Sequence, residues 1–152
     1  MADAELIRDT KGAEGCKLIA YLDTLGNWTV GYGHLLAAGV DWSGHEITQA
    51  TADQLLSLDL DSRAAQAATL PEWSALDTPC RRNAVIECVF NLGFGHWQRE
   101  FPATRAAIRG QRWMDAAKNL LNSPEWVMQV GLPRVSRLAA YLQNGSYTPQ
   151  PA

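Results

Sequence analysis

The stretch from Thr78 to Gly93 constrains the fold more than any other part of the sequence. Thr78-Pro79 provides a helix cap followed by a first-turn proline, and the residues through Leu92 are apolar on nearly every face of the helix that they would form. A helix that is apolar all round must be surrounded by other elements. We therefore expect a buried central helix with the amphipathic segments of the chain packed around it.

Helices are also predicted on both sides of this central one. Residues 2–11 are expected to form a short amphipathic helix that stops at Gly12. Apolar residues recur at helical spacing over about residues 48–68, where Thr48 or Thr51 can cap a long helix.

After the central helix, the chain is punctuated by glycines and prolines. We expect a loop of glycine and aromatic residues at 93–97, followed by short helices. Pro133 and Gly145 bracket the last helix, with the proline at its start and the glycine just past its end.

Strand-forming sequence is confined to a region near the N-terminus. Between Ala20 and His34, aromatic and β-branched residues flank a Gly26-Asn27 turn, which predicts a β-hairpin. The expected fold class is therefore α+β and predominantly α-helical. We expect a single domain over residues 1–152, made of a hairpin lobe (about 13–50), a linking helix (about 48–68) and a helical lobe (about 69–147).

Composition predicts a soluble globular protein. The 152 residues suffice for one compact domain. No apolar stretch approaches the ~20 residues of a membrane span, so we expect no stable membrane association. The acidic start at residues 1–5 lacks the basic and apolar regions of a secretory signal, which predicts synthesis in the cytoplasm.

Charge is divided unevenly along the chain. Residues 1–80 hold four Lys/Arg against twelve Asp/Glu, whereas residues 81–152 hold nine against four. The basic second half could attract an anionic polymer such as peptidoglycan or nucleic acid, although solvated helix faces explain most charge bias. Because basic and aromatic residues are not interleaved there, we expect no nucleic-acid binding.

The three cysteines are expected to be buried thiols in a reducing compartment. Cys16, Cys80 and Cys88 form no CxxC pair, and their odd number cannot pair completely within one chain. Cys80 and Cys88 are predicted to share one helix, where eight residues separate them by about 12 Å, too far for a disulfide.

A glutamate, an aspartate and a threonine around the hairpin are the candidate catalytic residues. Eight residues separate Glu14 from Asp23, five separate Asp23 from Thr29, and residues 29–34 read Thr-Val-Gly-Tyr-Gly-His. Hydrolysis of a glycosidic bond needs an acid for the departing oxygen and a carboxylate that assists the attack on the sugar. Glu14 at a cleft edge could stay protonated, Asp23 in wetter surroundings would be ionised, and Thr29 could hold a water molecule.

This motif resembles that of the phage-type lysozymes, the endolysin muramidases, which share the spacing and a Thr-[Val/Ile]-Gly-x-Gly-His hairpin. The similarity extends to residues 81–93, 111–120 and 133–137, and covers roughly residues 5–147. It implies a two-lobed lysozyme fold with a cleft between the hairpin lobe and the helical lobe. It also implies a bacteriolytic, antimicrobial hydrolase that cleaves the β-1,4 bond between N-acetylmuramic acid and N-acetylglucosamine in peptidoglycan.

The resemblance assigns roles to further residues. It makes Glu14 the general acid, while Asp23 assists and Thr29 positions the attacking water, with inversion at the sugar carbon. It pairs His34 with Asp59 in a structural ion pair and places Arg134 close to the catalytic glutamate. The residues expected to contact substrate are Leu35, Phe90, Thr104 and Asn119.

The resemblance also describes the setting of the reaction. It implies no metal and no organic cofactor, and we expect a monomer. The enzyme would reach the wall in the periplasm through a membrane lesion made by a holin, and so lyse the host cell. One departure from some relatives is Asn91, which stands where they have glutamine and could shorten one contact.

Alternative interpretations stay open at this point. Glu14 could face solvent, Asp23 could hold a turn, Thr29 could be an ordinary strand residue, and Leu35 and Phe90 could belong to the core. For the whole protein, the alternatives are a lytic transglycosylase, which cleaves the same bond without water, and a binding or scaffold module that has lost activity.

Overall fold

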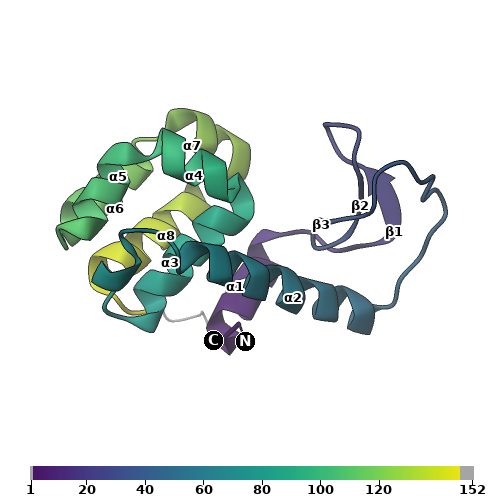
Figure 1. Cartoon of the computed structure of the whole chain (residues 1–152), viewed down its shortest axis with the longest axis horizontal. Coiled ribbons are helices and arrows are strands. Elements are labelled where there is room, and N and C mark those ends of the chain that lie inside the picture. The colour runs from purple at the N-terminus through teal and green to yellow at the C-terminus, as the bar shows by residue number, and fades with distance from the viewer. Residues whose placement is uncertain (1, 148–152) are drawn as a thin grey trace. The chain divides into compact units, whose positions relative to one another are not determined.

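We describe the protein from a computed structural model, which covers residues 2–147 (Figure 1). The chain forms two compact units that meet within one helix, with Ser62 as the last residue of the N-terminal unit and Arg63 as the first of the C-terminal unit. The N-terminal unit contains the sheet, and the C-terminal unit is helical. The predicted α+β, mainly helical fold class is confirmed.

The N-terminal unit is built on a three-stranded antiparallel sheet in the order β1-β2-β3. Its strands are β1 (Lys17–Leu22), β2 (Trp28–Gly31) and β3 (His34–Leu35). The predicted hairpin is confirmed as β1 and β2, whereas β3 is a third strand that the sequence pattern did not reveal. Helices α1 (Ala4–Ala13) and α2 (Gln49–Ala67) accompany the sheet.

Gly31, the first glycine of the Gly-Tyr-Gly-His run, is required by its backbone conformation. Its φ is +66°, in the left-handed region that side chains rarely adopt. A Cβ at this position would make only ordinary van der Waals contact, at 3.4 Å from the Cβ of Ala52 on α2. The strain of the backbone, rather than lack of space, therefore favours glycine at the end of β2.

The ends of the first two helices differ from the prediction. Helix α1 does not stop at Gly12 but continues through it to Ala13, and the backbone N–H of Glu14 donates to the carbonyl of Thr10 at 2.8 Å. One glycine within a helix costs only about 1 kcal/mol, which this last turn tolerates. At the start of α2, Thr48 is the cap, because its Oγ1 accepts from the backbone N–H of Thr51 at 3.1 Å; the Thr51 alternative is wrong.

The C-terminal unit is organised around the predicted central helix, α3 (Pro79–Leu92). Thr78 caps it through a hydrogen bond from the backbone N–H of Arg81 to Oγ1, and its residues from 83 to 89 are all buried. The last helix, α8 (Leu132–Asn144), packs against α3 and ends before Gly145, as predicted. Between them lie η1 (Trp73–Ala75), α4 (Phe94–Glu100), α5 (Pro102–Arg109), α6 (Trp113–Leu121) and α7 (Pro124–Val130).

Helix α4 corrects the prediction of a loop at residues 93–97. The side chain of Trp97 is completely buried and stacks on Phe101, with ring centroids 5.2 Å apart. Its indole N–H donates to the carboxylate of Glu72 at 3.0 Å, and Glu72 is itself buried against the guanidinium of Arg105 at 2.6 Å. Burying a large aromatic side chain with its polar atom satisfied outweighs the low helix propensity of the neighbouring glycines.

None of the three cysteines forms a disulfide, and only two of them are buried. Cys80 and Cys88 lie on α3 as expected, whereas Cys16 is exposed, which corrects the expectation of three buried thiols. The reason is its position in the short connection between α1 and β1, outside the core. Within residues 2–147, the helices are too short or too polar for any of them to cross a membrane.

Candidate active site

The three candidate catalytic residues all belong to the N-terminal unit. Glu14 is the first residue after α1, with an extended backbone (φ −100°, ψ 140°) that turns the chain towards β1. Asp23 follows the end of β1, and Thr29 lies within β2. Glu14 and Asp23 are half-buried, while Thr29 is buried.

Tyr21 on β1 is a residue near the candidate site that the motif analysis missed. Partial burial raises the pKa of its hydroxyl, and the charges of Asp23 and then Glu14 raise the pKa further. Both carboxylates therefore lie within Coulombic reach of its phenol. Tyr21 is also the Cα partner of Thr29 in the β1–β2 register.

Asp23 has a structural contact in addition to any chemical one. Its Oδ1 accepts hydrogen bonds from the backbone N–H groups of Leu25 at 2.9 Å and Asn27 at 2.8 Å. This is the turn-holding arrangement that the alternative interpretation described. The same bonds engage Oδ1 and fix the direction of the carboxylate.

The Thr29 hydroxyl is oriented by the backbone of the turn. The residue is 3% exposed, and its Oγ1 donates to the carbonyl of Asn27 at 3.0 Å. Because its proton is used in this way, Oγ1 presents lone pairs and acts as an acceptor. A water molecule bound there would donate to Thr29.

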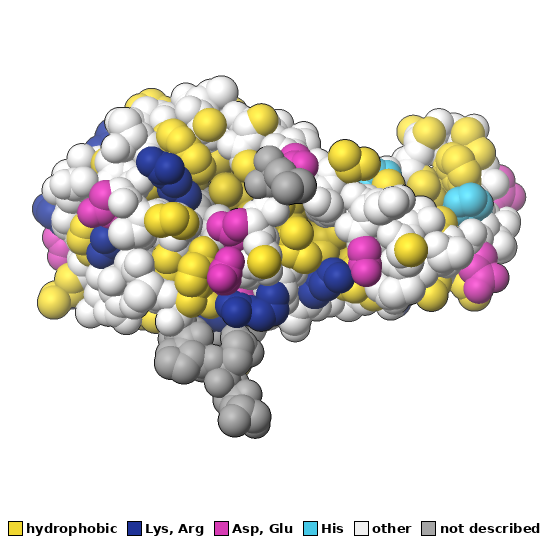
Figure 2. Space-filling view, turned by 90° about the horizontal axis from the view of Figure 1, so that it is seen from below, with side chains coloured by type: hydrophobic (Ala, Val, Ile, Leu, Met, Phe, Trp, Pro, Cys, Tyr) yellow, Lys and Arg dark blue, Asp and Glu magenta, His cyan; other side chains and the backbone are white. Residues whose placement is uncertain are grey.

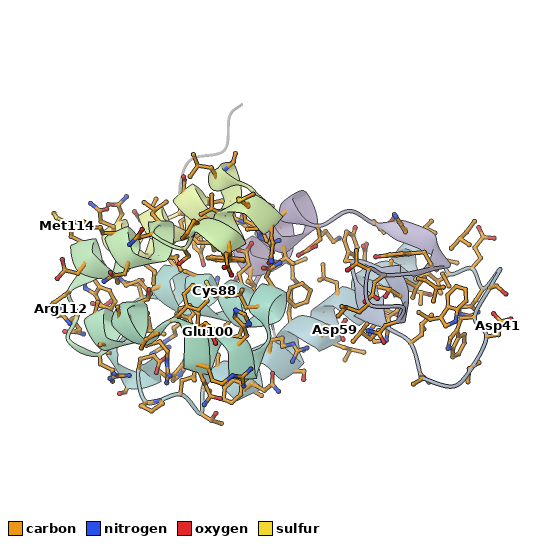
Figure 3. The ribbon with its side chains drawn as sticks, turned by 90° about the horizontal axis from the view of Figure 1, so that it is seen from above. Asp41, Asp59, Cys88, Glu100, Arg112 and Met114 are labelled. Carbon is orange, nitrogen blue, oxygen red and sulfur yellow. The ribbon has the colours of Figure 1, made fainter. Side chains whose placement is uncertain are left out.

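His34 and Asp59 form the expected pair. Nδ1 of His34 on β3 lies 2.9 Å and 3.1 Å from the two carboxylate oxygens of Asp59, which is labelled on α2 in Figure 3. This contact joins the third strand to the long helix. Among residues 2–147, no group of three or more His, Cys, Asp or Glu side chains is arranged so that it could hold a metal ion.

Two of the four predicted substrate residues line one pocket in the C-terminal unit. The pocket has a volume of about 160 Å³, and Thr104, which is 2% exposed, and Asn119 both line it. Glu100, labelled in Figure 3, lies at the same pocket together with Asn122 and Ser123. The pocket therefore offers hydroxyl, amide and carboxylate groups, which are suited to a polar ligand.

The other two predicted substrate residues are not among the residues that line this pocket. Phe90 lies in the last turn of α3 and is half-buried, and Leu35 on β3 is 58% exposed. The exposure of Leu35 contradicts the alternative that it is a core residue. Asn91 uses its side-chain oxygen to accept a hydrogen bond from the indole N–H of Trp126 at 2.7 Å.

Arg134 lies on α8 in the C-terminal unit, where one of its partners is a glutamate that the sequence did not single out. Its Nε is 3.3 Å from Oε1 of Glu87, and the same carboxylate contacts Arg137 at 2.6 Å. Glu87 is 1% exposed, so its charge is compensated by neighbouring guanidinium groups. The proximity of Arg134 to Glu14 stays a prediction.

Much of the positive charge of the second half is paired within the protein. Among residues 2–147, arginines of this part form ion pairs with Asp77, Glu72, Asp115 and Glu87. Figure 2 shows one face of the molecule, on which basic side chains lie next to acidic ones. Internal pairing reduces the charge that is available to attract an anionic polymer.

The comparison with protein families decides how this arrangement is interpreted. The family model described as phage lysozyme matches residues 11–140, which is well over half of the chain. The chain belongs to the phage lysozyme family. The matched range includes the three candidate catalytic residues and the helices that form the pocket. Phage lysozymes are endolysin-type glycoside hydrolases, and the substrate of this protein is accordingly bacterial peptidoglycan.

Proposed function

We propose that this phage lysozyme is a muramidase that hydrolyses the β-1,4 bond between N-acetylmuramic acid and N-acetylglucosamine. It would act as a monomer, without a metal or organic cofactor. Its role would be lysis of the host cell: after synthesis in the cytoplasm, the enzyme would reach the wall in the periplasm once the membrane has been opened.

The observation that carries the proposal is the match to the phage lysozyme family over residues 11–140, a range that holds Glu14 and Asp23, both of them within Coulombic reach of Tyr21. Hydrolysis of a glycosidic bond generally requires two carboxyl groups that flank the bond to be broken. Glu14 acts as the general acid and transfers its proton to the glycosidic oxygen as the bond to the sugar carbon breaks. Asp23 is the ionised partner on the side of the attacking water.

The roles of Thr29 and Asp23 follow from their hydrogen bonds. Thr29 Oγ1 accepts a hydrogen bond from the water, because its own O–H donates to the carbonyl of Asn27. The carboxylate of Asp23 accepts the proton that the water loses as its oxygen bonds to the sugar carbon. The attack comes from the face opposite the leaving group, so the configuration inverts. The products are two shorter glycan chains, one with a new reducing end.

Contacts with the rest of the substrate are assigned to both units. Leu35 offers an exposed apolar surface to a sugar ring, and Phe90 offers part of its ring. Thr104 and Asn119 offer a hydroxyl and an amide to the hydroxyl and acetamido groups of the substrate.

Mass spectrometry of digested peptidoglycan tests this function. Wild-type protein should release muropeptides with reducing ends, whose mass increases on borohydride reduction. Glu14→Gln should reduce the rate by about a thousandfold or more, because the amide cannot supply the proton. Glu46→Gln, which changes an exposed glutamate of the same unit, is the matched control and should retain the wild-type rate.

Three results would overturn the proposal. Anhydro products would indicate a lytic transglycosylase, and full turnover by Glu14→Gln would show that another group is the acid. Absence of any cleavage would favour a binding module. The anomer that is formed first, observed by NMR before mutarotation, tests inversion separately.

A further inference from the structure

Two glycines lie near Glu14 in the chain, one in the last turn of α1 and one directly after the glutamate. Gly12 and Gly15 flank the glutamate, and a Cβ added at either glycine would meet no atom within 4 Å. Packing therefore does not require glycine at these positions, and the glycines leave the backbone more conformational freedom than other residues would. A catalytic acid needs the opposite, because a displacement of about 1 Å can cost about a hundredfold in rate.

Two side chains on either side of Glu14 contact the first turns of the same helix. Nζ of Lys11, in the last turn of α1, lies 3.0 Å from Oδ1 of Asp53 on α2. Sγ of Cys16, just before β1, lies 3.9 Å from Oε1 of Gln49, also on α2. Residues 11–16 are thus held to α2 at both ends of the segment.

Tyr32 joins the hairpin to the same helical turn. Its hydroxyl lies 3.3 Å from Oδ1 of Asp53 and accepts a hydrogen bond from Nε2 of Gln49 at 3.0 Å. Nε2 of Gln49 also donates to Asp53 at 2.9 Å, and Nζ of Lys11 lies 5.8 Å from the centre of the Tyr32 ring. Tyr32 occupies the variable position of the Gly-x-Gly-His run and follows Thr29 by three residues.

We propose that Lys11, Tyr32, Gln49 and Asp53 form a positioning network that fixes Glu14 relative to the hairpin carrying Thr29. The inference rests on the muramidase function proposed above and adds residues to it. None of the four reacts with the substrate. Their contribution is to restrict the Gly12–Gly15 segment and the β2–β3 turn to one arrangement on the start of α2.

The ion pair between Lys11 and Asp53 is present at neutral pH, although both side chains are partly exposed. The side chains of Lys11 and Asp53 are 34% and 40% exposed, so water weakens each contact. Lys11 and then Gln49 hold the pKa of the Asp53 carboxyl below its usual value. The strength of the network lies in joining three segments rather than in any single bond.

Separate measurement of kcat and KM on solubilised glycan chains tests the network. Lys11→Met should lower kcat about tenfold, because Glu14 then samples unproductive positions, and should leave KM within about twofold. Lys11→Arg keeps the charge and should restore most of kcat. Lys118→Met is the matched control, since Lys118 is also a lysine in the last turn of a helix, and it should leave kcat unchanged.

Two further variants keep the test decisive if Lys11→Met unfolds. Tyr32→Phe keeps the ring and removes only the hydroxyl, and kcat should fall about threefold, the equivalent of one weak hydrogen bond. The exchange Lys11→Asp with Asp53→Lys rebuilds the pair in reverse and should recover kcat relative to either single variant.

The outcomes separate this inference from the proposed function. If wild-type protein releases reducing ends but Lys11→Met and Tyr32→Phe keep full kcat, the network has no positioning role. The same conclusion follows if Lys118→Met lowers kcat as much as Lys11→Met, since bulk charge would then explain the effect. If the wild type itself cleaves no glycan, the muramidase function fails before the network is tested.

Discussion

Replacing Thr29 with valine separates the structural role of this residue from its proposed catalytic one. Valine has nearly the same shape and suits a strand, so the substitution removes one hydroxyl and little else. The lost bond is the one to the carbonyl of Asn27 at 3.0 Å. That carbonyl keeps a second partner, the backbone N–H of Asp23 at 2.9 Å, and is not left unsatisfied.

The expected loss of stability is therefore small. A neutral hydrogen bond contributes about 1 kcal/mol to the free energy of unfolding, and the second partner of Asn27 keeps the cost at or below that value. For a chain of this length, such a change lowers Tm by about 2–4 °C. Nearly all molecules stay folded, and stability alone predicts an unchanged kcat.

The expected loss of activity is much larger. Without Oγ1 as an acceptor, the attacking water is no longer oriented, and kcat should fall about a hundredfold. Thr29→Ser keeps the hydroxyl and should retain most of the activity. Reducing-end release and calorimetry on the same preparations measure both quantities. If Thr29→Val keeps more than half of the wild-type kcat, Thr29 is an ordinary strand residue and its place in the mechanism is wrong.

Three further predictions concern other parts of the molecule. Glu72→Gln removes a buried charge that faces Arg105 at 2.6 Å, and should lower the free energy of unfolding in urea by about 3 kcal/mol; a loss below about 1 kcal/mol would show that the pair contributes little. In the native protein, only the thiol of Cys16 should react with a thiol reagent. Cys80 and Cys88 are buried, and burial raises the pKa of the Cys88 thiol. More than one fast-reacting thiol per molecule would contradict this prediction. In an NMR titration, Asp53 should have a pKa below its ordinary value of 3.8, and Lys11→Met should raise that pKa. The stabilisation from the pair is present above the ordinary pKa and is lost as the pH falls through the lowered pKa of the folded protein. An Asp53 pKa that Lys11→Met does not change would contradict the contact.

The features that the sequence predicted correctly are those determined by neighbouring residues. Helix α3 begins where Thr78 and Pro79 place a cap and a first-turn proline, and the hairpin forms where Gly26-Asn27 separates two strand-like runs. The motif of Glu14, Asp23 and Thr29 is local information of the same kind, and the catalytic role of these residues stays a prediction.

The features that the sequence did not predict depend on distant partners. Helix α4 forms because Trp97 finds a buried position beside Glu72, 25 residues earlier in the chain. The contacts of Tyr32 join residues of the β2–β3 turn to α2, which no local pattern indicates. Cys16 was expected to be buried because free cysteines usually are, but its place in a connection decided its exposure.

The pocket of the C-terminal unit is made by one continuous stretch of chain, since all of its lining residues fall between Glu100 and Ser123. Because the lining residues are contiguous in the sequence, one DNA segment encodes the whole pocket. A single recombination event between related genes would replace its shape and chemistry together, without altering the codons for residues 14–29. Changes confined to this one stretch can therefore alter the pocket while the candidate catalytic residues stay the same.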